Sequence, residues 1–203
     1  MQESELVTAA LAETIELNER VKHGDLAPVA QAAAVIIESL GREGRLLTFG
    51  NGGSAADAQH VSSELVGRFL RQRRSLAAIA LTTDTSVLTS VSNDESFERV
   101  FARQIEGLGR KGDVALGIST SGRSPNVIAG FKAARTQGLR TIALSGGEGG
   151  ALGPLVDIHI NVPSTSTPRV QEVHRTLLHV ICDLVERAFV KSSNTEDTEA
   201  SKA

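Results

Sequence analysis

Apolar residues follow two different patterns along the chain. At about residues 4–22 and again at 28–40 they recur every three or four positions, which predicts two helices before any strand. After residue 44 the pattern changes to short, continuous apolar runs separated by helical stretches. The runs cover residues 46–49, 76–81, 114–118, 141–144 and 158–162. Continuous runs are typical of strands buried on both faces, so they predict a doubly wound α/β fold with a mainly parallel, five-stranded sheet flanked by helices.

The two ends of the chain differ in the same pattern. A last long helix is expected over about 168–190, whereas residues 191–203 are polar and acidic and are predicted to be disordered. We expect one domain over residues 1–190, including the two N-terminal helices, because 203 residues suit a single α/β core.

The N-terminal helices have narrow, alanine-rich faces, and small residues let helices approach closely. We therefore expect them to pack against copies of the chain in an oligomer.

Composition narrows the class of partner. The net charge is −3 and aromatic residues make up 3%, with no Trp or Tyr, so neither a polyanion such as DNA nor a base-stacking surface is expected. The single cysteine, Cys182, cannot form an internal disulfide. No apolar run approaches the roughly 20 residues that span a bilayer, and the first residues lack the layout of a signal peptide. We expect a cytoplasmic protein that binds neither nucleic acid nor a membrane.

A glycine-rich turn follows the first predicted strand. It comprises Gly50, Asn51, Gly52, Gly53 and Ser54. In sheets of this kind ligands bind where such turns lead from a strand into a helix. Ser54 is expected to cap a helix that begins at Ala55, with Asp57 completing a variant of the capping box. A tight turn without a ligand would explain the same residues, and a dinucleotide site is disfavoured because no acidic residue lies about 20 positions further on.

A second polar loop follows the third predicted strand. It contains Ser119, Thr120, Ser121, Gly122 and Ser124. Pro125 comes next and suits the first position of a helix, because its missing N–H would have no partner there. The start of that helix would offer free backbone donors to an anion, and the hydroxyl groups would donate further hydrogen bonds. The loop is predicted to bind a phosphate group. A simple serine-capped helix entry would explain Ser124 and Pro125 but not the run from Ser119 to Ser121.

Two helical segments carry side chains suited to acid–base or metal chemistry. His60 and Glu64 lie four residues apart on one helix face, an arrangement that can hold a metal, move a proton or form a surface ion pair. Gln171 and His179 are eight residues apart, about 12 Å along the last helix. One metal ion could use both only if the side chains reach toward each other, if the helix is irregular, or if the ligands come from different subunits.

Other polar residues are expected to be structural. His174 is predicted to be a hydrogen-bonded structural histidine. A cluster of arginines is predicted to be a solvated helix end without a catalytic role. The cluster comprises Arg68, Arg71, Arg73 and Arg74.

On these motifs the chain resembles the sugar isomerase (SIS) domain family, and within it the isomerases of seven-carbon sugar phosphates. The matching segments are Gly50-Asn-Gly-Gly-Ser-Ala-Ala-Asp-Ala-Gln-His60, Ser63-Glu64-Leu65, Ser92-Asn93-Asp94, Gly117-Ile-Ser-Thr-Ser-Gly122 with Ser124 and Asn126, and Arg169-Val-Gln171-Glu-Val-His174 with His179. The resemblance extends over nearly the whole chain, to about Phe189. It implies the SIS fold and a homotetramer with active sites at subunit contacts.

The resemblance also implies an activity. Members convert sedoheptulose 7-phosphate to D-glycero-D-manno-heptose 7-phosphate through an enediol, the first step toward nucleotide-activated heptose. The zinc ligands implied are His60, Glu64, Gln171 and His179, with Glu64 as the base and His179 as the acid. Asp57 would assist in proton handling or merely cap its helix. The residues implied in binding the sugar phosphate are Asn51, Gly52, Gly53, Ser54, Asn93, Asp94, Ser119, Thr120, Ser121, Ser124 and Gln171.

Two other functions stay open at this point. A non-catalytic SIS protein that binds a replication initiator would resemble the chain over the same segments, although a binding module has no need for both Glu64 and His179. An isomerase of another phosphosugar is the second alternative, because the loops around the site determine which length of sugar chain fits.

Overall fold

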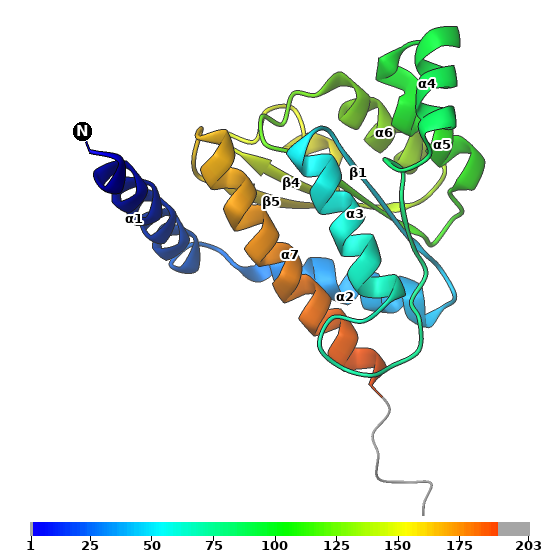
Figure 1. Ribbon diagram of the computed structural model, residues 1–203. Helices are drawn as coiled ribbons and strands as arrows, with labels where there is room; N and C mark the ends of the chain where they lie inside the picture. Colours follow the sequence, from blue (N-terminus) through cyan, green and yellow to red (C-terminus); the bar gives the residue numbers. More distant parts are fainter. Residues whose placement is uncertain (1, 191–203) are drawn as a thin grey trace, which may run out of the picture.

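A computed structural model describes residues 2–190 of the chain. In chain order its elements are α1 (Glu3–Lys22), α2 (Ala27–Gly41), β1 (Leu46–Gly50), α3 (Gly53–Val66), β2 (Ala78–Ala80), α4 (Thr85–Asp94), η1 (Phe97–Arg99), α5 (Val100–Leu108), β3 (Val114–Ser119), α6 (Pro125–Thr136), β4 (Arg140–Gly146), η2 (Gly153–Leu155), β5 (Ile158–Val162) and α7 (Thr167–Phe189). The predicted leading helices, five strands and last helix are confirmed, with ends that differ by one or two residues (Figure 1). The predicted disordered tail lies outside the described residues.

The five strands form one parallel sheet in the order β2-β1-β3-β4-β5. From β1 the chain first adds β2 on one side, and then returns to add β3, β4 and β5 on the other. The direction of winding therefore changes between β1 and β3, whose carboxyl ends lie side by side where Gly50 pairs with Ile118. Ligands of open α/β sheets bind in the crevice at this switch point.

Side chains alternate along each strand, so apolar residues point to both faces of the sheet. Helices cover both faces. Leu46 of β1 packs in a core with α2, α3 and α7, whereas the next residue, Leu47, packs in a second core with α5 and α6. Strands buried on both faces in this way explain the continuous apolar runs. Within the first core, buried Thr48 of β1 donates to the carbonyl of Ala58 over 2.8 Å, which fixes α3 on the sheet.

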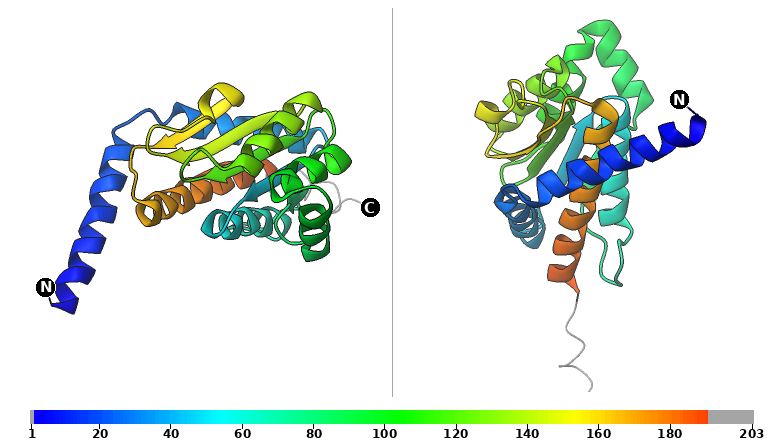
Figure 2. Two further views of the ribbon diagram at one scale, coloured as in Figure 1. Left: turned by 90° about the horizontal axis from the view of Figure 1, so that it is seen from above. Right: turned by 90° about the vertical axis from the view of Figure 1, so that its left-hand side faces the viewer.

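Helix α1 projects from the body of the molecule and contacts the first turns of α7 (Figures 1 and 2). Leu17 is its one buried residue, and Arg169 of α7 donates to the Ala10 carbonyl over 2.9 Å. Toward the N-terminus of α1, four apolar side chains are more than half exposed: Leu6, Val7, Leu11 and Ile15. Within residues 2–190, no helix has the length and apolar character needed to cross a membrane.

Candidate active site

The glycine-rich turn after β1 leads directly into α3. The helix begins at Gly53 with Gly52 as its N-cap, so the prediction that Ser54 caps a helix beginning at Ala55 is wrong. Gly52 has φ +56°, in the left-handed region that favours glycine, and this backbone conformation places the helix start two residues earlier. Ser54 is buried inside the first turn. Gly50 must lack a side chain, because a Cβ there would lie 2.8 Å from the carbonyl oxygen of Ile118.

The second polar loop lies against the first at the switch point. The Ser119 and Ser124 hydroxyls lie 2.9 Å apart, and α6 begins at Pro125 as predicted. Gly122 has φ +62°, and a Cβ there would overlap the carbonyl of Gly149 in the loop after β4. Beside the loop is a hollow of about 310 Å³. It is lined by Thr120, Ser121, Arg123, Gly146, Glu148 and Thr165, among others.

Asn51 and Asn126 join the two loops. Each side-chain amide donates to the side-chain oxygen of the other over 2.8 Å. Asn51 belongs to the first loop, while Asn126 lies in the first turn of α6 and is buried. The pair therefore sets the spacing between the two helix starts that were predicted to bind the substrate.

Helices α3 and α7 run parallel and side by side (Figure 1). Gln171 lies against Gly53, where a Cβ would overlap its amide. About one turn further along, Asp57 accepts a hydrogen bond from Nε of Arg175 over 2.8 Å. Beyond that pair, His60 meets His179. Functional side chains on the two helices thus face each other in successive pairs.

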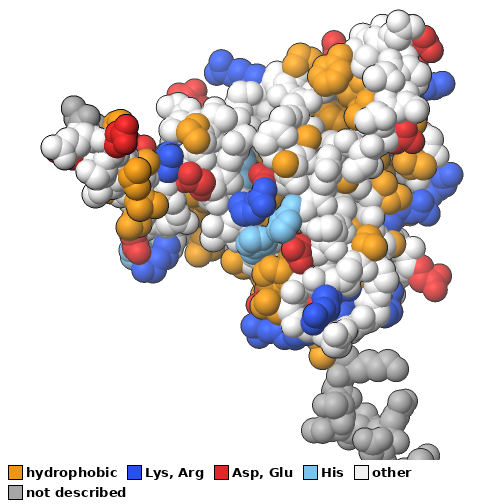
Figure 3. Space-filling model, viewed as in Figure 1, with side chains coloured by type: hydrophobic (Ala, Val, Ile, Leu, Met, Phe, Trp, Pro, Cys, Tyr) orange, Lys and Arg blue, Asp and Glu red, His pale blue; other side chains and the backbone are white. Residues whose placement is uncertain are grey.

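The histidine pair lies at the surface between the two helices, where histidine side chains gather beside basic and acidic ones (Figure 3). The Nε2 atoms of His60 and His179 are 2.8 Å apart, and Oε1 of Glu64 is 3.4 Å from Nε2 of His60. Side chains of His60 and Glu64 are 29% and 19% exposed, so a small molecule can reach them. Burial lowers the pKa of His179, and its neighbours His60 and Arg175 lower it further, although Glu64 and Asp57 act in the opposite direction. The imidazole is thereby kept neutral, the form that binds metals and accepts protons.

Asp57 does not cap its helix. Its carboxylate is 3% exposed and accepts hydrogen bonds from the Arg175 guanidinium, so the predicted capping role is wrong. The ion pair sits between Gln171 and the histidines, along a hollow of about 520 Å³ that Gly53, Gln171 and Arg175 also line. Proton handling by Asp57 stays a prediction.

Comparison with known proteins connects this geometry to a family. The SIS domain family matches residues 11–146. A phosphoheptose isomerase of Roseiflexus sp. (strain RS-1) is 52% identical over 87% of this chain and 89% of its own length. Another, of Helicobacter pylori (strain P12), is 50% identical over 78% of this chain and 83% of its own length. The chain belongs to the phosphoheptose isomerase family of SIS domain proteins.

Solved structures agree with this family membership. A phosphoheptose isomerase from Neisseria gonorrhoeae is 43% identical, with a TM-score of 0.87 over 92% of this chain and 100% of that one. A phosphoheptose isomerase from Francisella tularensis is 34% identical, with a TM-score of 0.89 over the same shares. The predicted SIS fold is confirmed, and the protein is an isomerase.

The predicted zinc ligands of this family member are only partly assembled within one chain. Nitrogen ligands of tetrahedral zinc, each about 2.0–2.1 Å from the metal, lie roughly 3.3 Å from each other. The Nε2 atoms of His60 and His179 approach this spacing, and the Glu64 carboxylate adjoins them, so the donor types and their convergence suit zinc. Gln171 lies on the far side of the Asp57–Arg175 pair. Among residues 2–190, no three His, Cys, Asp or Glu side chains are grouped closely enough to hold a metal ion, so the zinc site stays a prediction.

Asn93 and Asp94 lie apart from the other predicted residues. They end α4, a helix at the corner of the molecule away from α1 and α7 (Figure 1). Both are exposed, and Asn93 donates to the Asp94 carboxylate over 2.8 Å. Their role in substrate binding stays a prediction.

Two residues beside the histidines escaped the sequence reasoning. Arg175 could have been found, because it lies four residues from both Gln171 and His179 on the same helix face. Phe69 stacks on the His179 ring with centroids 5.4 Å apart and planes at 29°, a contact between distant segments that no local pattern signals. A larger hollow of about 560 Å³ opens at the opposite end of the strands, near Arg45 and Arg110, and holds none of the predicted site residues.

Proposed function

We propose that this protein converts sedoheptulose 7-phosphate to D-glycero-D-manno-heptose 7-phosphate, the first step toward nucleotide-activated heptose. Its membership of the phosphoheptose isomerase family supports the substrate. The observation that carries the chemistry is the convergence of Glu64, His60 and His179 between α3 and α7, about two helical turns beyond the first ligand loop. A protein that only binds a partner would have no use for this arrangement.

The loops are suited to the phosphate end of the substrate. The hydroxyls of Ser119, Ser121 and Ser124, together with backbone N–H groups at the start of α6, would donate hydrogen bonds to the phosphate oxygens. From Gly53 the helix α3 rises about 10 Å to His60, a length comparable with an extended seven-carbon chain. A phosphate held at the loops would therefore leave the C1 and C2 carbons near the histidine pair, and would supply binding energy for positioning them.

Isomerisation moves a proton between C1 and C2 through an enediol. Glu64 would take the proton from the substrate as the carboxylate base, and His179 would give and recover protons at the substrate oxygens. Zinc would be held by His60, Glu64, Gln171 and His179, and when bound it would polarise those oxygens. Asp57, ion-paired with Arg175 beside Gln171, would support these groups and assist in proton handling.

The same proposal includes a cytoplasmic homotetramer with active sites at subunit contacts. Three features of the chain support such an assembly. The histidine pair lies at an open surface, α1 carries exposed apolar side chains, and Asn93 and Asp94 lie away from the loops. A neighbouring copy could cover the first two and bring the third to the site. Light scattering of the purified protein would then give four times the chain mass.

One coupled assay tests the activity. The purified protein, loaded with zinc, should convert sedoheptulose 7-phosphate, lose turnover with a chelator and regain it when zinc is returned. Pentose and hexose phosphates serve as controls for substrate length. No turnover of the heptose phosphate after zinc loading would overturn the proposal, and faster turnover of a shorter sugar phosphate would assign the protein to another substrate.

A further inference from the structure

A buried carboxylate holds the loop that follows α3. Glu186, in the last turns of α7, is fully buried. Its two oxygens accept hydrogen bonds from three consecutive backbone N–H groups, those of Phe69, Leu70 and Arg71, over 2.8, 2.7 and 2.8 Å. One side chain thus fixes three successive residues of the connection between α3 and β2.

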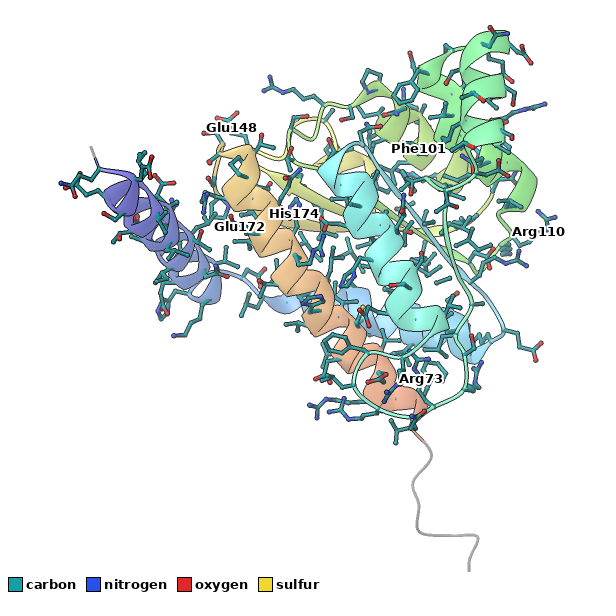
Figure 4. All side chains as sticks on the ribbon, in the orientation of Figure 1. Arg73, Phe101, Arg110, Glu148, Glu172 and His174 are labelled. Carbon is teal, nitrogen blue, oxygen red and sulfur yellow. The ribbon has the colours of Figure 1, made fainter. Side chains whose placement is uncertain are left out.

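Arg73 completes this anchor from the opposite direction. Its side chain is fully buried beside the end of α7, so the prediction of a solvated arginine cluster is wrong for this residue (Figure 4). Arg73 donates to the backbone carbonyl of Glu64 over 2.7 Å and to that of Gly67 over 2.9 Å. Glu64 lies in the last turn of α3 and Gly67 is its C-cap, where the helix itself supplies no donor for the carbonyls. Nε of Arg73 also lies 3.6 Å from Oε1 of Glu186.

The anchor reaches the histidine pair through Phe69. Its backbone N–H is held by Glu186, and its ring stacks on the imidazole of His179. The ring lies over one face of the imidazole, with centroids 5.4 Å apart, while Nε2 faces His60 across 2.8 Å. The other chemical groups lie on α3 and α7, whereas Phe69 comes from the loop between α3 and β2.

We propose that Glu186 is a positioning residue for His179: it fixes the backbone of Phe69, and the Phe69 ring in turn sets the orientation of the imidazole. Burying an ion pair such as Glu186 and Arg73 is costly, and apolar residues of similar volume often stabilise a protein equally well. The three backbone hydrogen bonds give the carboxylate a role that an apolar residue could not take, since they specify where Phe69 lies. The proposal rests on the proposed isomerase activity for its kinetic consequence only.

The ionisation state of Glu186 agrees with this role. Burial alone would raise the pKa of its carboxyl group, but the three backbone donors and Arg73 outweigh burial and hold the pKa below its usual range. Glu186 therefore stays a carboxylate, with both oxygens available as acceptors, throughout the neutral range.

Four variants test the proposal. Glu186→Gln replaces one acceptor oxygen by a donor, and Phe69→Leu removes the ring but keeps apolar bulk. Phe69→Tyr retains the ring and should rescue the function. Phe101→Leu makes the same change on α5, in the second core and far from the histidine pair (Figure 4). It controls for a general loss of stability.

Two measurements separate positioning from stability and from the reaction itself. Histidine ring signals in NMR spectra of the purified protein report the ring current of Phe69 on His179 without any turnover. Both Phe69→Leu and Glu186→Gln should shift the His179 signals, while Phe69→Tyr and Phe101→Leu leave them in place. In the isomerase assay, the first two variants should lower kcat about tenfold or more, with KM changed less than about twofold, because misplaced catalytic groups slow the chemical step.

Several results would overturn the inference. Unchanged His179 signals in Glu186→Gln would show that the carboxylate does not position Phe69. Equal kcat losses in Phe69→Leu and Phe101→Leu would assign the effect to stability. If Glu186→Gln fails to fold, the Phe69 variants alone decide whether the ring orients His179. A wild-type protein without turnover would defeat the proposed function, but the NMR comparison would still decide the positioning role.

Discussion

His174 donates its Nε2–H to the backbone carbonyl of Ser145 over 3.0 Å, which joins the middle of α7 to β4 beneath the site (Figure 4). Because a carbonyl can only accept, Nε2 carries the proton and Nδ1 of the neutral ring does not. Nδ1 is buried and has no hydrogen-bond partner among residues 2–190. The predicted structural histidine is thus confirmed as hydrogen-bonded. A second proton on its ring would be buried without an acceptor.

The protein should therefore lose stability in mild acid through His174. Burial lowers its pKa from the ordinary 6.5, although Ser145 and Asp57 act in the opposite direction. Below pH 6.5 the unfolded chain binds a proton at this position that the folded chain does not, so the free energy of unfolding falls as the pH falls. Above that pH this residue adds no pH dependence. The slope from one such group is at most about 1.4 kcal/mol per pH unit.

Urea unfolding of the wild type and of His174→Gln at several pH values between about 7.5 and 5 checks this expectation. The glutamine side chain keeps an N–H donor for Ser145 but cannot be protonated in this range. The variant should show a shallower loss of stability with falling pH. The same slope in both proteins would mean that other groups govern the acid sensitivity.

Replacing the proposed base or acid should abolish turnover without changing the assembly. Glu64→Gln removes the carboxylate and His179→Gln removes the imidazole, while both keep similar volume. We expect kcat to fall by about 10²-fold or more in each, the usual cost of losing an acid–base group. His23→Gln is the matched control and should retain full activity, because among residues 2–190 the exposed His23 side chain pairs only with Glu19. A near wild-type rate in either site variant would remove that residue from the mechanism.

Zinc binding should depend on the histidine pair. His60→Ala removes one of the two facing Nε2 donors, and we expect at least a tenfold loss of zinc affinity in competition with a chelator. The competition measures metal directly and needs no substrate. Tight zinc binding that survives in a double variant lacking both His60 and His179 would place the metal elsewhere.

Gly122→Ala should damage the phosphate loop. The residue has φ +62°, and a Cβ there would overlap Gly149 in the loop after β4. The loop after β3 and the loop after β4 would therefore have to move apart. We expect a loss of about 1–3 kcal/mol in stability and a raised KM for the sugar phosphate. Gly107→Ala is the control: within residues 2–190 no neighbouring atom lies within 4 Å of its added Cβ, so this change in α5 should be neutral or stabilising. Equal effects of both substitutions would contradict a special role for the loop.

Local patterns predicted the fold well because the central strands β1, β3 and β4 are buried along nearly their whole length, and the long helices carry recurring apolar positions. The glycine turn was predicted less well. Ser54 is an ordinary N-cap residue by type, but the positive φ of Gly52 lets the helix begin earlier, and composition does not reveal which glycine adopts that conformation.

Long-range partners account for the other differences. Nothing near Arg73 in the sequence indicates burial, because the carboxylate that accompanies it, Glu186, lies far along the chain. The same holds for Asp57, whose partner Arg175 comes from the last helix. The first error concerns a residue that was predicted to lie at a solvated helix end, and the second a residue that was predicted to cap its helix. Their burial depends on how α3 and α7 pack together.

The matched positions on α3 and α7 limit how the length of the chain can vary. Gly53 meets Gln171, Asp57 meets Arg175 and His60 meets His179 only while both helices advance in step. One extra residue within either helix would turn everything beyond it by about 100° and carry the later partners out of reach. Natural insertions and deletions should consequently be confined to the connections outside these two helices.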